Sequence, residues 1–361
     1  MRVTRIFLVL LFGGLLFVTN NCSTSTELPP VELPLSIAYS PDLSGTNIDS
    51  LFVCDDKGER KQFLTTVKEL HSIVWPPEGE KIYVQENHVS PLATYIYAVA
   101  ELGGEKEEIF STSGLSRLAA ISRDGKVIIL RMRETGSEIL ELFRLNTDQG
   151  STKKLSNGQT EDDLPAISPN VTMLAYEGSV PEQSFGNIFL YNLYSGSRVQ
   201  VTGFDSTFID AITFSPNNGY IYFSCRQQTG STFTAYLMRY AINSKGIDTL
   251  YSYTSAFSND YISDLTWSDG KTQLAFTARS EGNDKRHIFI MDLNGSNRRQ
   301  ISTVSAEYTL KGFNGIYVYF SYDSENENGI YKIDAGSSEI TSLIECSACK
   351  NIIWDFKALY R

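Results

Sequence analysis

A bulky apolar residue followed by a tight turn recurs seven times along the chain and constrains the fold more than any other feature. In the copy LTWSDGKTQLAF, Trp267 ends one apolar run, Asp269-Gly270 lies in the turn, and a second apolar run follows. Gly tolerates positive φ and Asp bonds its own turn, which predicts a hairpin. The bulky position recurs about every 41 to 53 residues. It is occupied by Trp75, Ile121, Ile167, Phe214, Trp267, Phe313 and Trp354.

Each repeat continues with three more short segments that read as strands. After Trp267 these are LAF, HIFIMDL and RRQIS, separated by polar turns such as DLNG. Four short strands in a unit of roughly 40–50 residues predict one four-stranded antiparallel blade of a β-propeller. Open twisted sheets rarely exceed about ten strands, so one continuous sheet does not fit this number. We therefore expect an all-β fold.

The two ends of the repeat region complement each other. Residues 36–40, 51–55 and 61–65 supply a second, third and fourth strand without a first. NIIWDF, near the C-terminus, is a first strand without the other three. Joining them gives one blade shared between the termini, which closes the ring and hides its strand edges. This predicts seven blades; six is the alternative if a terminal unit is degenerate.

The N-terminus has the pattern of a targeting segment. Arg2 and Arg5 precede an apolar run over residues 6–18. This run is shorter than the roughly 20 residues of a membrane-spanning helix and is typical of a signal peptide. Cys22 follows, and then a polar, Pro-rich tract that suits a tether. We assign residues 1–21 to the signal peptide, 22–33 to a lipidated N-terminus and tether, and 34–361 to the propeller.

This segment resembles a bacterial lipoprotein signal, in which the cysteine becomes the first mature residue and carries the lipid. The resemblance implies lipidation of Cys22, export to the cell envelope, and anchoring in a membrane on the periplasmic side or at the cell surface. Thr19, Asn20 and Asn21 depart from the usual residues before the cysteine. An ordinary secretory signal followed by a chance cysteine is the alternative.

The repeat itself resembles that of TolB-like β-propellers, in which an apolar residue, Ser-Pro-Asp-Gly, an apolar run and a closing Arg-Gln-Leu-Thr succeed one another. The best copies are WSDGKTQLAF with HIFIMDLNGSNRRQIS, and FSPNNGYIYF. The resemblance covers about residues 35–357, although WPPEGEKIY and FNGIY depart from it. It implies the fold and leaves the activity open.

Several classes of function are disfavoured. A net charge of −11 without a basic run argues against nucleic-acid binding. No G-x-S-x-G elbow of a serine peptidase is present. The three histidines, His71, His88 and His287, lack metal-ligand spacing. The acidic groups Asp55-Asp56 and 161–163 are expected in a turn and in solvated loops. We therefore expect no catalytic residue, metal or cofactor.

The cysteines other than Cys22 give a modest signal. Cys346 and Cys349 form a CxxC just before the closing strand, where a local disulfide could pin the ring in an exported protein. Cys54 and Cys225 lie in the middle of apolar segments of different blades, so we expect them to be buried free thiols.

A column of polar residues lies four positions before each bulky residue, which is five before the first residue of the turn. Loops that lead into the first strands surround the mouth of the central channel, where propellers commonly bind ligands. The alternative is that any strand entrance at a surface is polar. The candidate channel-mouth residues are His71, Arg117, Asp163, Asp210, Ser263, Thr309 and Lys350.

These features favour a lipid-anchored, non-catalytic scaffold that binds an envelope protein or glycan. A propeller-type hydrolase or lyase with its site in the central channel is the alternative, so enzymatic activity stays open. A third possibility is an assembly partner of an outer-membrane machine.

Overall fold

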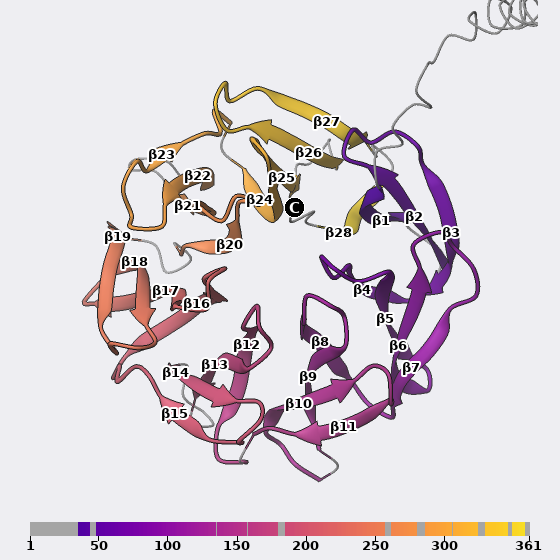
Figure 1. Cartoon of the computed structure of the whole chain (residues 1–361), viewed down its shortest axis with the longest axis horizontal. Coiled ribbons are helices and arrows are strands. Elements are labelled where there is room, and N and C mark those ends of the chain that lie inside the picture. The colour runs from indigo at the N-terminus through magenta and orange to yellow at the C-terminus, as the bar shows by residue number, and fades with distance from the viewer. Residues whose placement is uncertain are drawn as a thin grey trace, which may run out of the picture. The chain divides into compact units, whose positions relative to one another are not determined.

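The computed structural model describes residues 35–43, 48–134, 136–156, 158–179, 185–256, 261–279, 286–304, 306–323, 329–345 and 349–357. Seven four-stranded antiparallel sheets follow one another around a ring, each with its first strand near the centre (Figure 1). The predicted seven-bladed all-β propeller is confirmed, and the six-bladed alternative is wrong. The described residues contain no helix long and apolar enough to cross a membrane.

The strands of blades 1 to 3 are given from the centre outwards. Blade 1 has β4 (Leu70–Val74), β5 (Lys81–Val89), β6 (Leu92–Ala100) and β7 (Glu107–Thr112). Blade 2 has β8 (Ser116–Ile121), β9 (Val127–Arg133), β10 (Leu140–Asn146) and β11 (Ser151–Lys154). Blade 3 has β12 (Glu161–Ile167), β13 (Met173–Ser179), β14 (Gly186–Asn192) and β15 (Arg198–Gln200).

Blades 4 to 6 repeat this order. Blade 4 has β16 (Thr207–Phe214), β17 (Tyr220–Thr229), β18 (Thr232–Ala241) and β19 (Ile247–Ser255). Blade 5 has β20 (Ser263–Trp267), β21 (Gln273–Arg279), β22 (Arg286–Asp292) and β23 (Arg299–Gln300). Blade 6 has β24 (Glu307–Asn314), β25 (Tyr317–Asp323), β26 (Gly329–Asp334) and β27 (Ile340–Glu345).

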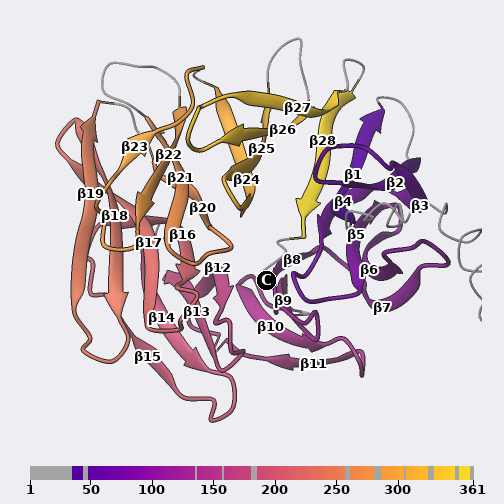
Figure 2. The ribbon, with the colours of Figure 1, turned by 45° about the horizontal axis from the view of Figure 1, so that its top comes forward.

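The closing blade joins the two ends of the described chain, as predicted. From the centre it has β28 (Cys349–Phe356), β1 (Leu35–Leu43), β2 (Ile48–Asp55) and β3 (Gln62–Lys68). β28 pairs with β1 in antiparallel register, with Tyr39 opposite Trp354 and Ile37 opposite Phe356. Figure 2 shows β28, in yellow, beside β1, in indigo. The pairing covers the edge that each strand would otherwise expose.

The turn after the first strand explains why the repeat begins with serine. In blade 5, the hydroxyl of Ser268 accepts the backbone N–H of Gln273 at 3.0 Å, and its carbonyl accepts the N–H of Lys271 at 2.8 Å. Positive φ falls on Lys271, at 57°, and not on Gly270. The same place, three residues after the serine, has φ of 56° at Val171 and 60° at Asn218. The turn geometry therefore depends on the serine bonds more than on glycine.

The bulky residues that define the repeat pack between neighbouring blades. Trp267 contacts Tyr222 of blade 4 edge to face, with ring centroids 4.8 Å apart. Five of the seven bulky residues are buried, and Ile121 and Ile167 are half-buried. Each blade thus buries part of its apolar surface against the next, which is how a ring of small sheets obtains a core.

One expectation about acidic residues is wrong. Residues 161–163 lie in β12 and not in a solvated loop, and Asp162 is fully buried. Its Oδ1 accepts a hydrogen bond from Thr160 Oγ1 at 2.7 Å, which offsets part of the cost of burying the carboxyl group. Asp55 does end a strand and accepts the backbone N–H groups of Lys57 and Glu59, so the predicted turn is confirmed.

The cysteine predictions are resolved in part. Cys54 and Cys225 are buried free thiols, as expected. Cys346 and the side chain of Cys349 lie outside the described residues, so their disulfide stays a prediction. Cys22, with the rest of the signal peptide and the tether, also lies outside the described residues.

Candidate functional site

The predicted polar column lies on the innermost strands, at the end of the ring where these strands begin. We call this the entrance end; the opposite end, which carries the serine turns, is the exit end. The column residues occupy β4, β8, β12, β16, β20, β24 and β28. The side chain of Lys350 lies outside the described residues. The other six fall into three neighbouring groups, described in turn below.

His71 and Arg117 line a cavity of about 690 Å³ between the innermost strands of four blades. Lys311 of β24 and Asp355 of β28 also face this cavity. Burial lowers the pKa of His71, and the nearby Arg117 lowers it further. Burial raises the pKa of Asp355, whose Oδ2 accepts the backbone N–H of Trp75 at 2.7 Å. This cavity presents basic and acidic groups to whatever enters the channel.

Asp163 and Asp210 form the second group, and each is paired with an arginine from a second strand. Arg131 Nη2 lies 3.2 Å from Asp163 Oδ2. Arg226 Nε donates to both carboxylate oxygens of Asp210 at 3.0 Å, and its Nη2 lies 2.9 Å from Oδ1. Burial nevertheless raises the pKa of Asp210 to about 6.

Glu177 of β13 lies opposite Asp163 in the register of blade 3 and adds a further carboxyl group here. Burial raises its pKa to about 7, and the charges of Asp163 and Asp210 contribute to the increase. Arg131 opposes this shift. A carboxyl group that titrates near neutral pH is able to exchange a proton at physiological pH.

Ser263 and Thr309 form the third group and line a cavity of about 470 Å³ between blades 5 and 6. Arg286 of β22 also lines this cavity, and its Nη2 donates to Ser263 Oγ at 2.6 Å. Asp264 Oδ2 accepts hydrogen bonds from the hydroxyls of Ser263, at 2.7 Å, and Thr277, at 3.1 Å. Burial raises the pKa of the Asp264 carboxyl group.

Strand register explains which site residues the sequence pattern missed. Arg117 is opposite Arg131, Asp163 opposite Glu177, Ser263 opposite Thr277, and Thr309 opposite Ser321. A second polar column therefore follows the second strands at the entrance end. In the sequence, each of these residues is the polar position that follows the second apolar run, such as Arg131 after VIIL and Glu177 after LAY.

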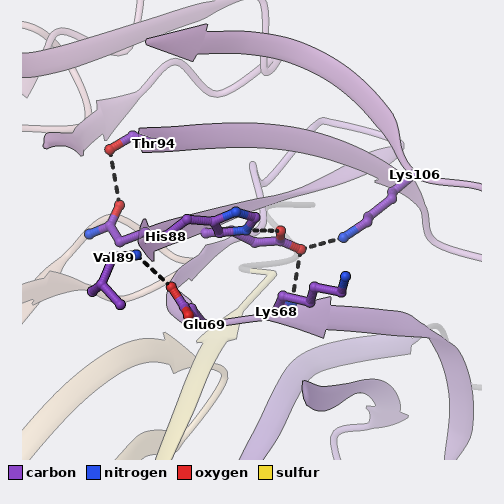
Figure 3. A network of polar contacts seen from close by, with 8 residues as sticks. Lys68, Glu69, His88, Val89, Thr94 and Lys106 are labelled. Atoms are coloured by element: carbon purple, nitrogen blue, oxygen red, sulfur yellow. Dashed lines mark hydrogen bonds and ion pairs between the residues drawn. The ribbon is translucent and has the colours of Figure 1, made fainter. Parts of the chain in front are cut away.

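A separate polar network ties the closing blade to blade 1 (Figure 3). The buried carboxylate of Glu86 accepts the backbone N–H of Lys68 at 3.1 Å, contacts His88 Nε2 at 3.0 Å, and pairs with Lys106. Glu69 accepts the backbone N–H of Val89 at 2.9 Å. Because these bonds join β3 to β5 and their flanking segments, we interpret the network as structural. His88, a residue considered for metal binding, belongs to it.

The described residues contain no group of three or more His, Cys, Asp or Glu side chains that could hold a metal ion. His71, His88 and His287 lie in three different strands, and each has its own surroundings. The arrangement at the entrance end therefore offers hydrogen bonds, charge and cavities for binding, and one carboxyl group suited to proton transfer.

No protein-family model matches the chain. Among solved structures, the chain is similar to TolB from Acinetobacter baumannii, with a TM-score of 0.54 and 13% identity over 92% of this chain and 89% of that one. It is also similar to the β-propeller domain of the Trilobed protease from Pyrococcus furiosus, with a TM-score of 0.60 and 12% identity over 86% and 95% of the two chains.

An oligogalacturonate lyase in complex with manganese gives a TM-score of 0.58 and 10% identity over 87% of this chain and 85% of that one. The fold is that of a TolB-like β-propeller. At these identities the similarity shows the fold alone, because the similar structures include both TolB and enzymes.

Proposed function

We propose that this protein is an exported, lipid-anchored propeller that binds a protein or glycan of the bacterial cell envelope at its entrance end, without catalysis. One observation carries the proposal. Polar side chains of the first strands, His71 and Arg117 among them, line a cavity of about 690 Å³, and those of the first and second strands of blade 6 line one of about 470 Å³. Concave sites of this size with a few convergent polar groups are typical of ligand binding.

The charge pattern supports binding more than turnover. Asp163 and Asp210 are each held by an arginine, so their geometry is fixed before a ligand arrives. Such preorganisation favours recognition, because less conformational entropy is lost on binding. The similarity to TolB is compatible with a binding role, although it supports the fold alone.

The binding proposal is tested by reversing one charge at each end of the propeller. Arg117 is exposed and lines the larger cavity, whereas Lys271 is exposed in a serine turn at the exit end. The full chain in detergent is applied to an array of bacterial envelope glycans and cross-linked to a panel of purified envelope proteins. We expect a ligand that Arg117→Glu loses and Lys271→Glu keeps. A ligand lost equally by both variants, or no ligand at all, contradicts the proposal.

The lipid anchor is tested separately. Globomycin treatment and Cys22→Ala should both leave the precursor unprocessed at the expected site and change its distribution between membrane and soluble fractions. If neither treatment changes processing or fractionation, the proposal of a lipid anchor is wrong. The proposal of binding at the entrance end does not depend on this result.

A propeller-type hydrolase or lyase is the second candidate, and Glu177 is the observation that favours it. Its carboxyl group, with a pKa raised to about 7, has the property of a general acid that works near neutral pH. A solved structure of similar fold is an oligogalacturonate lyase. Chain cleavage of an acidic polysaccharide by the full chain, abolished in Glu177→Gln, would favour this candidate. No cleavage by the unaltered protein would contradict it.

A further inference from the structure

Arg286, at the start of β22, is a buried cation whose hydrogen-bonding capacity is only partly used. Its side chain is 5% exposed. Its Nη2 donates to the carbonyl of Tyr261 at 3.0 Å and to Ser263 Oγ at 2.6 Å. Its Nε is buried and has no acceptor among the described residues. A buried donor without an acceptor costs free energy, and more so on a charged group.

Two other arginines at the entrance end, Arg131 and Arg226, are paired with carboxylates instead. Arg131 and Arg226 lie within 3.2 Å of the carboxylates of Asp163 and Asp210. Arg286 forms no ion pair with any described carboxylate, and the nearby Asp264 is hydrogen-bonded to hydroxyls instead. The charges of Asp264 and Asp210 act on Arg286 from a distance, but no described carboxylate forms a direct ion pair with its guanidinium.

The cavity of about 470 Å³ beside Arg286 has an unusual lining. The ring of Tyr261 lies under the guanidinium, with 4.2 Å from Cζ to the ring centroid. The other phenol and hydroxyl groups come from Tyr308, Thr309, Ser321 and Tyr322 of blade 6. Among the described lining residues, Ile352 is the single aliphatic side chain. Exposed Glu307 lies at the same cavity and offers an acceptor for hydroxyl groups.

We propose that this pocket, between blades 5 and 6, binds a hexuronate: a six-membered sugar ring that carries a carboxylate. The inference rests on the proposed function, since it specifies one ligand group for the entrance end. The carboxylate accepts hydrogen bonds from the guanidinium group of Arg286, because guanidinium and carboxylate match in charge and geometry. The C–H face of the sugar ring packs on a phenol ring, and its hydroxyls bond Thr309, Ser321 or Glu307.

The lining favours an acidic sugar over a peptide with a free C-terminus. A peptide end presents the same carboxylate but needs apolar side chains to hold the residue beside it. Hydroxyl and phenol groups instead match a ring that carries several hydroxyls. A cavity of about 470 Å³ is within the range of roughly 300–1,000 Å³ for small-molecule sites.

The first test compares three small probes by titration calorimetry on the full chain in detergent. D-glucuronate carries the carboxylate, D-glucose has a hydroxymethyl group in its place, and an N-acetylated dipeptide carries a C-terminal carboxylate. We expect D-glucuronate to bind at least about tenfold more tightly than the other two. D-glucose lacks the carboxylate and so loses the charged hydrogen-bonded pair, whereas the dipeptide keeps the carboxylate but lacks the ring hydroxyls. No binding of D-glucuronate, equal binding of D-glucose, or tighter binding of the dipeptide each overturns the proposal.

The second test removes the cation. Arg286→Gln should weaken D-glucuronate binding at least about tenfold and leave D-glucose unchanged. Arg239→Gln is the matched control: it removes an arginine of the neighbouring blade 4 that pairs with the exposed Asp248, away from the pocket. If Arg286→Gln does not fold, Thr309→Tyr serves instead, because the exposed Thr309 side chain tolerates a larger group that fills the cavity. Unchanged binding in the folded variant overturns the proposal.

Failure here is distinguishable from failure of the proposed function. A ligand that Arg117→Glu loses and Arg286→Gln keeps would support binding at the entrance end and refute the hexuronate pocket. Loss of D-glucuronate binding in Arg286→Gln, with no envelope ligand affected by Arg117→Glu, would support the pocket and refute the wider site.

Discussion

Replacing Glu177 with Gln should make the protein more stable at neutral pH, although it removes a charged side chain beside two arginine pairs. Burial, together with the charges of Asp163 and Asp210, raises the pKa of Glu177 from its ordinary value of 4.5 to about 7. The folded state therefore holds this proton more tightly than the unfolded chain does. Stability from this group is greatest where the folded carboxyl is protonated, and it is lost as pH rises from about 4.5 to about 7.

The magnitude follows from the two pKa values. The difference corresponds to about 1.4 kcal/mol for each pH unit between the two values. Compared with a side chain that stays uncharged, Glu177 therefore lowers the free energy of unfolding by about 3 kcal/mol at pH 7.5 and by about 1 kcal/mol at pH 5. Gln keeps the shape and an oxygen acceptor but has no charge to desolvate. We expect Glu177→Gln to raise the free energy of unfolding by about 2–3 kcal/mol at pH 7.5 and by about 1 kcal/mol or less at pH 5.

Urea unfolding of the full chain, followed by tryptophan fluorescence at both pH values, measures this difference. Glu78→Gln is the control, because Glu78 is 57% exposed and pairs with Arg123 at the surface. Its effect should stay within about 1 kcal/mol at both pH values. The reasoning is refuted if Glu177→Gln destabilises the protein at pH 7.5, or if its effect is the same at both pH values.

Three further predictions concern the scaffold. The thiols of Cys54 and Cys225, whose pKa values burial raises to about 12, should react with a thiol reagent only after unfolding, and rapid reaction of the native chain would contradict this. Gly312→Ala should lower the free energy of unfolding by about 1–3 kcal/mol, because its Cβ would lie 2.1 Å from Cδ1 of Phe356 in the closing blade. Denaturant titration measures this change, and an unchanged midpoint would contradict the prediction. Trp267→Ala should cost about 3–5 kcal/mol by the same measurement, since it empties a contact between blades 4 and 5, and a loss below about 1 kcal/mol would argue against that contact.

The repeat pattern was sufficient to predict the blades and their closure, because packing between blades requires a large residue at one fixed place. Trp75 and Trp354 mark that place even where the turn after them departs from the usual residues. The positive φ at Lys271 was not foreseen, since the serine bonds that set the turn depend on a register that composition does not reveal.

Of the residues at the site, the sequence predicted only those on the first strand of each blade. The column that contains Asp163 and Asp210 could be found by counting back from the bulky residues. Arg226 could not be assigned to Asp210, because a β-bulge in β16 shifts the pairing locally. Arg131 could not be assigned to Asp163, because it reaches that residue from a neighbouring blade. Arg286 comes from a third strand, and its contact with Ser263 in the first strand depends on distances in space.

The closing blade has a consequence for the order in which the molecule can be completed. Synthesis delivers β1, β2 and β3 long before β28, which contributes residues 349–356. Until then β1 presents an open edge, and the apolar cluster shared by Tyr39, Trp354 and Phe356 is incomplete. A nascent propeller of this design therefore stays vulnerable to edge-to-edge association until its last strand arrives. Protection of the chain by chaperones would matter most during that interval.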